Sequence, residues 1–128
     1  MRDQIGYRSE LWLTTFVANQ PFFAQWSFEV TDYAPWHADF LAVIEVLQNS
    51  AGFESLSLLH SPDEPTYYSV LSKWQDVGSY RRALSATNAK LVVWPFLAPM
   101  LPAPTVFETL LEVTPSEVTA HASTLQQD

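Results

Sequence analysis

Every second position from residue 22 to residue 30 carries an apolar side chain. Phe22, Ala24, Trp26, Phe28 and Val30 follow this spacing, and polar residues fill most of the positions between them. A period of two is that of a β-strand with one buried face. The segment therefore predicts a half-buried strand, whose apolar face the rest of the domain must cover.

A helix is expected after this strand. Asp32 can cap it, and Pro35 fits its first turn because the first N–H groups of a helix have no intrahelical partner. Gly52 can supply the stop. Between these limits, one apolar stripe at helical spacing is formed by Trp36, Phe40, Val43, Ile44 and Leu47.

Two strands and a second helix follow. Residues 53–61 and 66–74 read as a hairpin, because the turn sequence 62–65 separates them. Asp76 can cap the second helix. One face of that helix combines Val77, Tyr80, Leu84, Thr87 and Leu91.

The end of the chain is rich in proline. Pro95, Pro99, Pro102 and Pro104 forbid a long continuation of the second helix, so residues 94–101 are expected to form an irregular apolar cover. Residues 105–113 then predict a fourth strand, and residues 114–128 a polar tail that frays.

The order strand, helix, strand, strand, helix, strand predicts one α+β domain over residues 22–113. It is the ferredoxin-like split βαβ arrangement, in which helices cover one face of an antiparallel sheet. The other face needs a partner, and a second copy of the chain is the simplest one. Residues 1–21 are expected to add a strand or an arm that crosses to the other subunit.

Composition excludes several functions. The 14 acidic residues outweigh 6 Lys and Arg, which argues against nucleic-acid binding and against an acidic membrane surface. The chain has no Cys and no apolar run near the ~20 residues of a membrane span, so we expect a cytoplasmic protein. Aromatic residues make up 14%, more than a small core needs, and predict a pocket or an interface.

Few residues remain as candidates for chemistry. With only three Gly, a glycine-rich phosphate loop is absent, and no His and carboxylates stand at metal-ligand spacing. His60 shares the strand parity of Leu56 and Leu58 and is expected to face the interior. Trp74 on the next strand and Tyr80 on the helix could reach the same cavity.

Each candidate also has a structural interpretation. His60 could be a satisfied polar group at a strand end, and Trp74 and Tyr80 could be core packing. Arg81 and Arg82 read as solvated helix surface. His37 and His121 are expected to be inert surface residues.

Four segments together resemble the antibiotic biosynthesis monooxygenase family. They are Ala51-Gly52-Phe53, Leu59-His60-Ser61, Lys73-Trp74-Gln75-Asp76 with Tyr80-Arg81-Arg82, and the Pro-rich stretch before the last strand. The resemblance covers residues 22–113 and implies a homodimeric α/β barrel. In the anthrone-oxidising members, a strand His, the Trp and the helix Tyr surround the substrate and match His60, Trp74 and Tyr80.

The resemblance implies a cofactor-independent monooxygenase that oxidises a small anthrone-like or polyketide-like phenol to a quinone. Molecular oxygen is the co-substrate, with no metal and no flavin. His60 would handle the proton, Tyr80 would donate to the oxyanion, and Trp74 would position the ring. Further substrate contacts would come from Trp26, Tyr68, Val70, Ala83, Leu84, Trp94 and Phe96.

Two departures from the anthrone-oxidising members keep alternatives open. Val70 stands where the oxidases have an Asn, and no Arg follows Arg82. The haem-degrading branch needs a His near the position of Ala83, which argues against haem. The alternatives are a non-oxidative isomerase or cyclase on the same barrel, and a small-molecule-binding or assembly module without catalysis.

Overall fold

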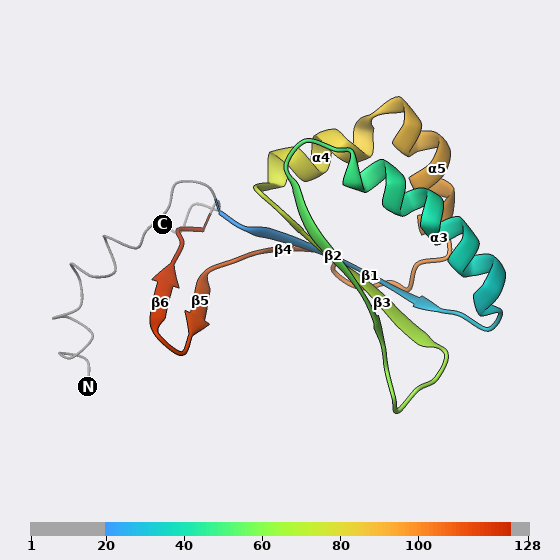
Figure 1. The fold of residues 1–128 in the computed structure, drawn as a ribbon, viewed down its shortest axis with the longest axis horizontal. Helices are drawn as coiled ribbons and strands as arrows, with labels where there is room; N and C mark the ends of the chain where they lie inside the picture. The colour runs from blue at the N-terminus through green and yellow to red at the C-terminus, as the bar shows by residue number, and fades with distance from the viewer. Residues whose placement is uncertain (1–19, 124–128) are drawn as a thin grey trace, which may run out of the picture.

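A four-stranded antiparallel sheet carries the domain in the computed structural model, which describes residues 20–123 (Figure 1). The strand order is β2-β3-β1-β4, and the helices lie on one face of the sheet. The predicted α+β fold of ferredoxin-like type is therefore confirmed. The strands are β1 (Phe22–Glu29), β2 (Phe53–His60), β3 (Tyr67–Trp74) and β4 (Val106–Glu108). The helices are α3 (Tyr33–Gln48), α4 (Val77–Ser85) and α5 (Thr87–Leu97).

Strand β1 lies in the middle of the sheet, as its alternating pattern predicts. It pairs with β3 along its whole length and with β4 at its start. Ala24, Trp26 and Phe28 are each only 1% exposed, because they point toward the helices. The opposite face of β1 carries Phe23 and Gln25, and no helix of the described residues packs there.

Helix α3 follows the predicted stripe. Phe40, Val43 and Leu47 are buried and pack on the sheet and on α5. Asp32 stands at the N-cap, but its side chain makes no capping hydrogen bond. Gly52, with a φ of 88°, lies in the turn that leads from α3 into β2.

The second helical region differs from the sequence prediction. Ala86 adopts an extended conformation and divides the region into α4 and α5. Helix α5 then continues through Pro95, so the predicted irregular cover is wrong for residues 94–97. Proline is tolerated there because it stands in the last turn, where it removes a single helical hydrogen bond. Leu91, predicted to lie on the core face, is 72% exposed.

The predicted fourth strand is also corrected. Main-sheet pairing ends at Glu108, and the chain then forms a separate hairpin of β5 (Leu111–Thr114) and β6 (Glu117–Ala120). Residues 117–120 of the expected frayed tail are thus a strand. The expectation that His121 is an inert surface residue is also wrong, because its side chain is buried and its Nε2 lies 2.6 Å from the carboxylate of Glu112. The expected N-terminal arm falls almost entirely on residues 1–19, outside the described residues. None of the helices in the described part is long and apolar enough to cross a membrane.

Candidate functional site

The hydroxyl of Tyr80 is the centre of a buried aromatic cluster under α4. The indole Nε1 of Trp26 donates a hydrogen bond of 3.1 Å to it. The ring of Trp74 meets the ring of Tyr80 edge-on, with centroids 5.5 Å apart, and Phe22 lies 5.6 Å away on a tilted plane. Two strands and one helix thus bring two of the three predicted catalytic residues together.

Local features of the chain seat α4 against the sheet. The carboxylate of Asp76 accepts hydrogen bonds from the backbone N–H and the hydroxyl of Ser79, at 2.8 and 2.9 Å. The carbonyl of Gly52 accepts from the N–H of Gln75 at 2.8 Å. A side chain at Gly52 would overlap Ser79, so only glycine permits this approach. The cap that the sequence predicts at Asp76 is confirmed.

Burial shapes the chemistry of Tyr80. Desolvation raises the pKa of the phenol, and the hydrogen bond from Trp26 offsets part of that effect. The group is therefore neutral near pH 7 and keeps its proton. The Tyr80 hydroxyl donates to no acceptor within residues 20–123. This O–H can therefore donate a hydrogen bond to a substrate oxygen on which negative charge develops, as an oxyanion donor must.

Trp74 contributes a ring and no free donor. Its Nε1 donates to the hydroxyl of Ser72 at 2.8 Å, and both residues are buried. Trp74 itself is fully covered, and Trp26 is 1% exposed. Any substrate that touches these rings must therefore displace side chains that now cover them.

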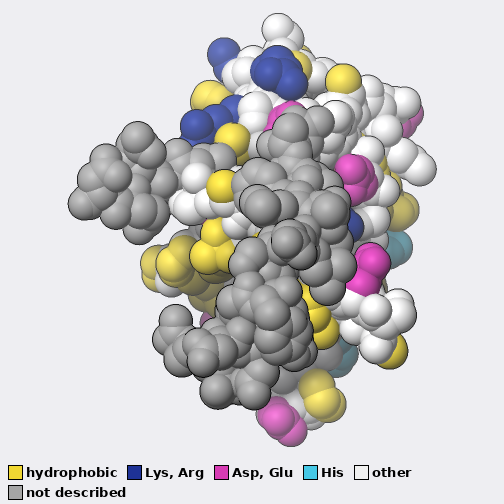
Figure 2. All heavy atoms as spheres, turned by 90° about the vertical axis from the view of Figure 1, so that its left-hand side faces the viewer, with side chains coloured by type: hydrophobic (Ala, Val, Ile, Leu, Met, Phe, Trp, Pro, Cys, Tyr) yellow, Lys and Arg dark blue, Asp and Glu magenta, His cyan; other side chains and the backbone are white. Residues whose placement is uncertain are grey.

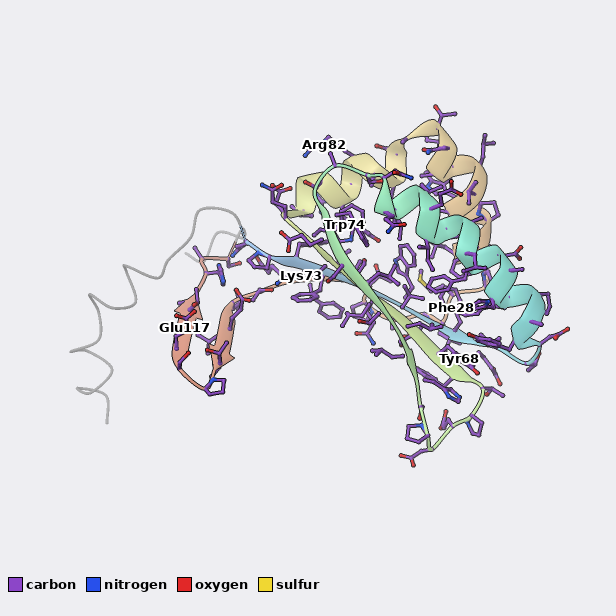
Figure 3. The ribbon with its side chains drawn as sticks, in the orientation of Figure 1. Phe28, Tyr68, Lys73, Trp74, Arg82 and Glu117 are labelled. Atoms are coloured by element: carbon purple, nitrogen blue, oxygen red, sulfur yellow. The ribbon has the colours of Figure 1, made fainter. Side chains whose placement is uncertain are left out.

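His60 lies at the other end of the sheet. Phe53 pairs with Trp74 at one end of β2, while His60 pairs with Tyr68 at the opposite end. The six steps from Tyr68 to Trp74 along β3 correspond to about 20 Å. Figure 3 shows these two residues of β3 far apart. The prediction that His60, Trp74 and Tyr80 meet in one cavity is therefore wrong for His60.

The surroundings of His60 explain its position. The side chain is exposed at the strand end, where its Nε2 lies 2.7 Å from the carbonyl oxygen of Pro65. Its ring stacks on Tyr68 with centroids 4.4 Å apart. The strand parity is correct, because Tyr68 is on the helix-covered face. The inference that this parity buries the imidazole is wrong. Tyr33 and Trp36 of α3 pack on Tyr68, and His60 lies beyond Tyr68 on β2, an edge strand of the sheet.

The residues expected to contact the substrate lie in different parts of the structure. Trp26 and Val70 face each other across β1 and β3, and Ala83 is buried one turn after Tyr80. Tyr68 belongs instead to the His60 end of the sheet.

The other three contacts lie on or near the helices. Phe96 packs on Phe28, Trp36 and Phe40. Leu84 is half-buried, and its carbonyl accepts from the indole of Trp94, which is 51% exposed. Trp94 is thus outside the cluster.

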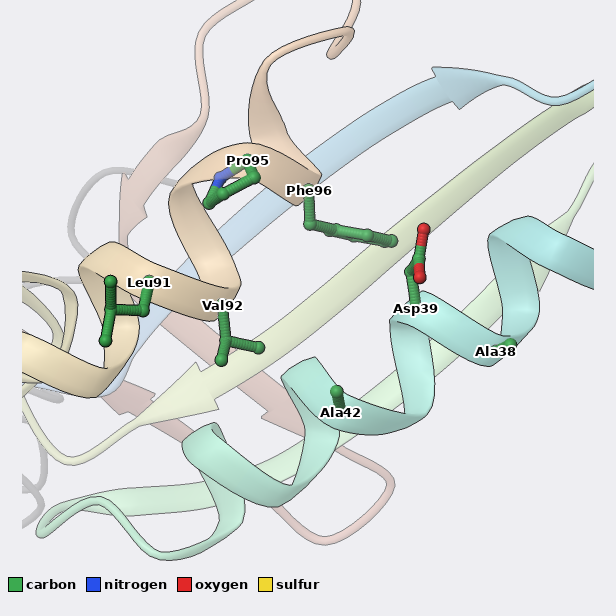
Figure 4. Close-up of a pocket in the computed structure, with 7 residues that line it drawn as sticks. All are labelled: Ala38, Asp39, Ala42, Leu91, Val92, Pro95 and Phe96. Carbon is green, nitrogen blue, oxygen red and sulfur yellow. The ribbon is translucent and has the colours of Figure 1, made fainter.

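A surface groove of about 320 Å³ lies between α3 and α5 (Figure 4). It is lined by residues of these two helices, which Figure 4 labels: Ala38, Asp39, Ala42, Leu91, Val92, Pro95 and Phe96. The groove includes none of Trp26, Trp74 and Tyr80. Within the described part of the chain, no three His, Asp or Glu side chains converge as metal ligands would.

Sequence reasoning missed how the cluster is connected. It places Trp26 among the substrate contacts, but not as the residue that holds the Tyr80 hydroxyl. Phe22 is a second omission, for which apolar parity is the only signal. The link between a strand and a helix 54 positions later has no periodicity that could reveal it.

Known structures share the fold of this chain. No family model matches the sequence, and no curated protein sequence matches it. SnoaB, a cofactor-independent oxygenase from Streptomyces nogalater, superposes over 78% of this chain and 100% of its own, with a TM-score of 0.65 and 20% identity. The chain has the fold of the antibiotic biosynthesis monooxygenases.

Two other solved structures have a similar fold. A proposed antibiotic biosynthesis monooxygenase from Caulobacter crescentus matches 80% of this chain and 95% of its own, with a TM-score of 0.57 and 17% identity. Rv0793 from Mycobacterium tuberculosis matches 73% of this chain and 99% of its own, with a TM-score of 0.58 and 15% identity. These likenesses establish an antibiotic biosynthesis monooxygenase fold, and the reaction must be argued from the site.

Proposed function

We propose that the chain is a cofactor-independent monooxygenase acting on a small aromatic substrate of the anthrone or phenol type. The observation that carries the proposal is the buried Tyr80 hydroxyl, which accepts a hydrogen bond from Trp26 and donates to no acceptor among residues 20–123. The likeness to SnoaB supports the same reaction class. The molecule is proposed to act as a cytoplasmic homodimer.

The proposed reaction oxidises a methylene carbon beside the aromatic rings to a carbonyl. The carbon releases a proton, which later protonates the peroxide anion, and the resulting carbanion passes an electron to dioxygen. The two radicals combine to a peroxide, which collapses to the quinone and releases one water. Negative charge spreads onto the phenolic oxygen, so a neutral donor in a dry site stabilises the anion.

Three side chains have roles in this scheme. Tyr80 donates its O–H to the oxyanion, and Trp74 packs against the flat substrate. Trp26 is a positioning residue, because its indole N–H orients the phenol. His60 has no role in the proposed site, since it lies at the far end of β2.

Oxygen uptake in the presence of an anthrone tests the proposal. The wild type should consume one dioxygen per anthrone, and Tyr80→Phe should lower kcat/KM by about 100-fold or more, as loss of an oxyanion donor does elsewhere. Tyr67→Phe is the matched control, because Tyr67 is exposed and lies on the opposite face of the sheet. Equal rates for wild type, Tyr80→Phe and buffer would refute catalysis at this site.

A second function is favoured by one observation. The rings of Trp26 and Trp74 are covered by the protein's own side chains, which suits a binding or assembly module without catalysis. Such a module would bind an aromatic ligand or a partner and leave the oxygen concentration unchanged. Turnover of a substrate under nitrogen would indicate the isomerase or cyclase alternative.

A further inference from the structure

This acidic chain has one basic segment. Residues 77–107 contain no Asp or Glu, so all 14 acidic residues lie elsewhere. The same segment holds three of the six Lys and Arg residues, Arg81 and Arg82 on α4 and Lys90 on α5. Figure 2 shows Lys and Arg side chains gathered at the top of the molecule, the level at which Figure 1 places α4 and α5. A chain of net charge −8 thus has a positive surface over these two helices.

The three cations of this segment are free of ion pairs. None of them lies within 4.0 Å of a carboxylate oxygen among residues 20–123. Arg82 is partly engaged, because its guanidinium donates to the hydroxyl of Ser79 at 3.4 Å. The side chains of Arg81 and Lys90 are exposed. These two cations are therefore the ones that a carboxylate of another molecule reaches most directly.

Exposed apolar side chains adjoin the cation of α5. Lys90, Leu91 and Trp94 share one face of this helix, because they are three or four positions apart. Leu91 is 72% exposed and Trp94 is 51% exposed. The ammonium group of Lys90 lies 5.6 Å from the centre of the Trp94 ring. Trp and Arg side chains are enriched where proteins bind one another, so this composition is typical of a binding surface.

Trp94 is held in position before any partner arrives. Its Nε1 donates to the carbonyl of Leu84 at 2.9 Å, which ties α5 to the end of α4. Arg81 lies three positions before Leu84 and therefore on the same side of α4. A fixed ring loses little conformational entropy on binding. The surface made of Arg81, Lys90, Leu91 and Trp94 is here called the α4–α5 patch.

The groove between α3 and α5 continues this patch, because Leu91 belongs to both. Asp39 also lines the groove, and its charge would repel an acidic group. Figure 4 shows Asp39 and Leu91 at opposite ends of the groove. An acidic side chain at the Leu91 end would thus approach the cations of the patch rather than Asp39.

We propose that the α4–α5 patch and the adjoining groove bind an amphipathic helix of another protein, whose polar face is acidic. Carboxylates of that helix pair with Arg81 and Lys90, and its apolar side chains pack on Leu91 and Trp94. A groove between two helices accepts the apolar face of a third, which argues for a helix as the occupant. The absence of any acidic residue from residues 77–107 argues for an acidic one.

Two other anionic partners fit this patch less well. A nucleic acid or an acidic membrane extends far beyond three cations and then meets the carboxylates of the remaining surface. A single helix covers the patch and little else. The charge distribution therefore favours a protein partner.

Fluorescence anisotropy with a synthetic peptide tests the proposal on the full chain. The probe is a fluorescein-labelled amphipathic peptide of ~18 residues, with Leu on one helical face and Glu on the other. It should bind the wild type, and added salt should weaken the binding because the ion pairs are exposed. A peptide with Lys in place of Glu should bind at least tenfold more weakly. No binding of the acidic peptide, or equal binding of the Lys peptide, would overturn the proposal.

Charge variants locate the contact. R81Q/K90Q should weaken the binding of the acidic peptide by about tenfold. T66E/S116E is the matched control, because it lowers the net charge by the same amount in the turns of the β2–β3 and β5–β6 hairpins, away from α4 and α5 (Figure 1). The control should bind within twofold of the wild type. Equal weakening by the two double variants would show that net charge, and not the patch, attracts the peptide.

A second pair of variants tests the apolar part of the contact. Leu91→Ser should weaken the binding of the acidic peptide by at least threefold. Leu110→Ser is its control, because Leu110 is 54% exposed and lies outside α4 and α5. If Leu91→Ser had no effect, or if both variants lost the same affinity, the assigned surface would be wrong.

Phosphatidylserine vesicles and a labelled DNA duplex distinguish the other anionic partners. Neither should bind the wild type at physiological ionic strength. Binding of either one that R81Q/K90Q abolishes would assign the patch to that partner and refute the acidic helix. All of these assays omit the anthrone, so their outcome does not depend on the monooxygenase proposal.

Discussion

Trp26 donates its indole N–H to the hydroxyl of Tyr80 over 3.1 Å, and this bond joins the central strand to α4. Both groups are buried, so neither can exchange its partner for water. The bond therefore serves the fold and the proposed site together. It predicts that the two residues are coupled in stability.

Tyr80→Phe should destabilise the protein by about 1–3 kcal/mol, because the variant leaves the indole N–H of Trp26 buried without an acceptor. Trp26→Phe removes this donor. Adding Tyr80→Phe to that variant should therefore lower the free energy of unfolding by less than it does in the wild type. Urea unfolding of both single variants and the double variant measures the coupling, expected at about 0.5–3 kcal/mol. Strict additivity would show that the hydrogen bond contributes nothing.

Asp76 should stabilise the protein in a pH-dependent way. Hydrogen bonds from Ser79, backbone first, hold the pKa of this carboxyl below its ordinary value. A lowered folded-state pKa gives stability that is present above the unfolded pKa and lost as the pH falls through the folded pKa. Asp76→Ala should thus cost about 0.5–2 kcal/mol at pH 7 and progressively less below pH ~4.

Asp32→Ala is the matched control for that experiment. Asp32 also stands at a helix N-cap, but its side chain accepts no capping hydrogen bond. Urea midpoints at the two pH values should therefore move less for Asp32→Ala than for Asp76→Ala. Equal losses for both variants at both pH values would contradict the assigned role of Asp76.

Gly52→Ala should be strongly destabilising. The backbone there has a φ of 88°, which costs a non-glycine residue about 1–3 kcal/mol, and the added Cβ would overlap Ser79. Gly78→Ala is the comparison, because Gly78 lies within α4 and the nearest atom to its Cβ is the flexible Arg82 guanidinium at 3.1 Å. That change should be neutral or gain up to ~1 kcal/mol. Thermal unfolding of both variants distinguishes the two glycines.

His60→Ala should leave oxygen uptake nearly unchanged. Its exposed imidazole contacts Pro65 and Tyr68, at the opposite end of the sheet from Tyr80. Loss of the Pro65 contact should lower stability by no more than about 1 kcal/mol. If kcat/KM fell tenfold while the variant stayed folded, the imidazole of His60 would take part in the reaction. The active site would then not be the cluster around Tyr80.

Local signals in the sequence were sufficient for half of the fold. The parity of Phe22 to Phe28, the stripe from Phe40 to Leu47 and the cap at Asp76 depend on neighbours within a few residues. Periodicity and capping chemistry therefore predict β1, α3 and the start of α4 without knowledge of the tertiary structure.

Tertiary context decided the rest. Parity states which face of β2 carries His60, but not how far α3 reaches over that face, so its burial could not be read from the sequence. The residues after Glu108 look like a continuation of β4 because their apolar content is similar. Whether such a run stays in the sheet depends on a pairing partner. The β1–β4 ladder ends where Phe22 pairs with Glu108, and one further hydrogen bond joins the N–H of Thr109 to the carbonyl of Pro21.

The central place of β1 has a kinetic consequence. This strand is synthesised before both of its sheet neighbours, and it pairs with β3 only after α3, β2 and the intervening turn have emerged from the ribosome. Sheets built from such non-local pairs fold slowly, and an unpaired apolar strand invites association with other nascent chains. During translation, this chain should depend on chaperones most in the interval after residues 22–30 have been synthesised and before β3 has been.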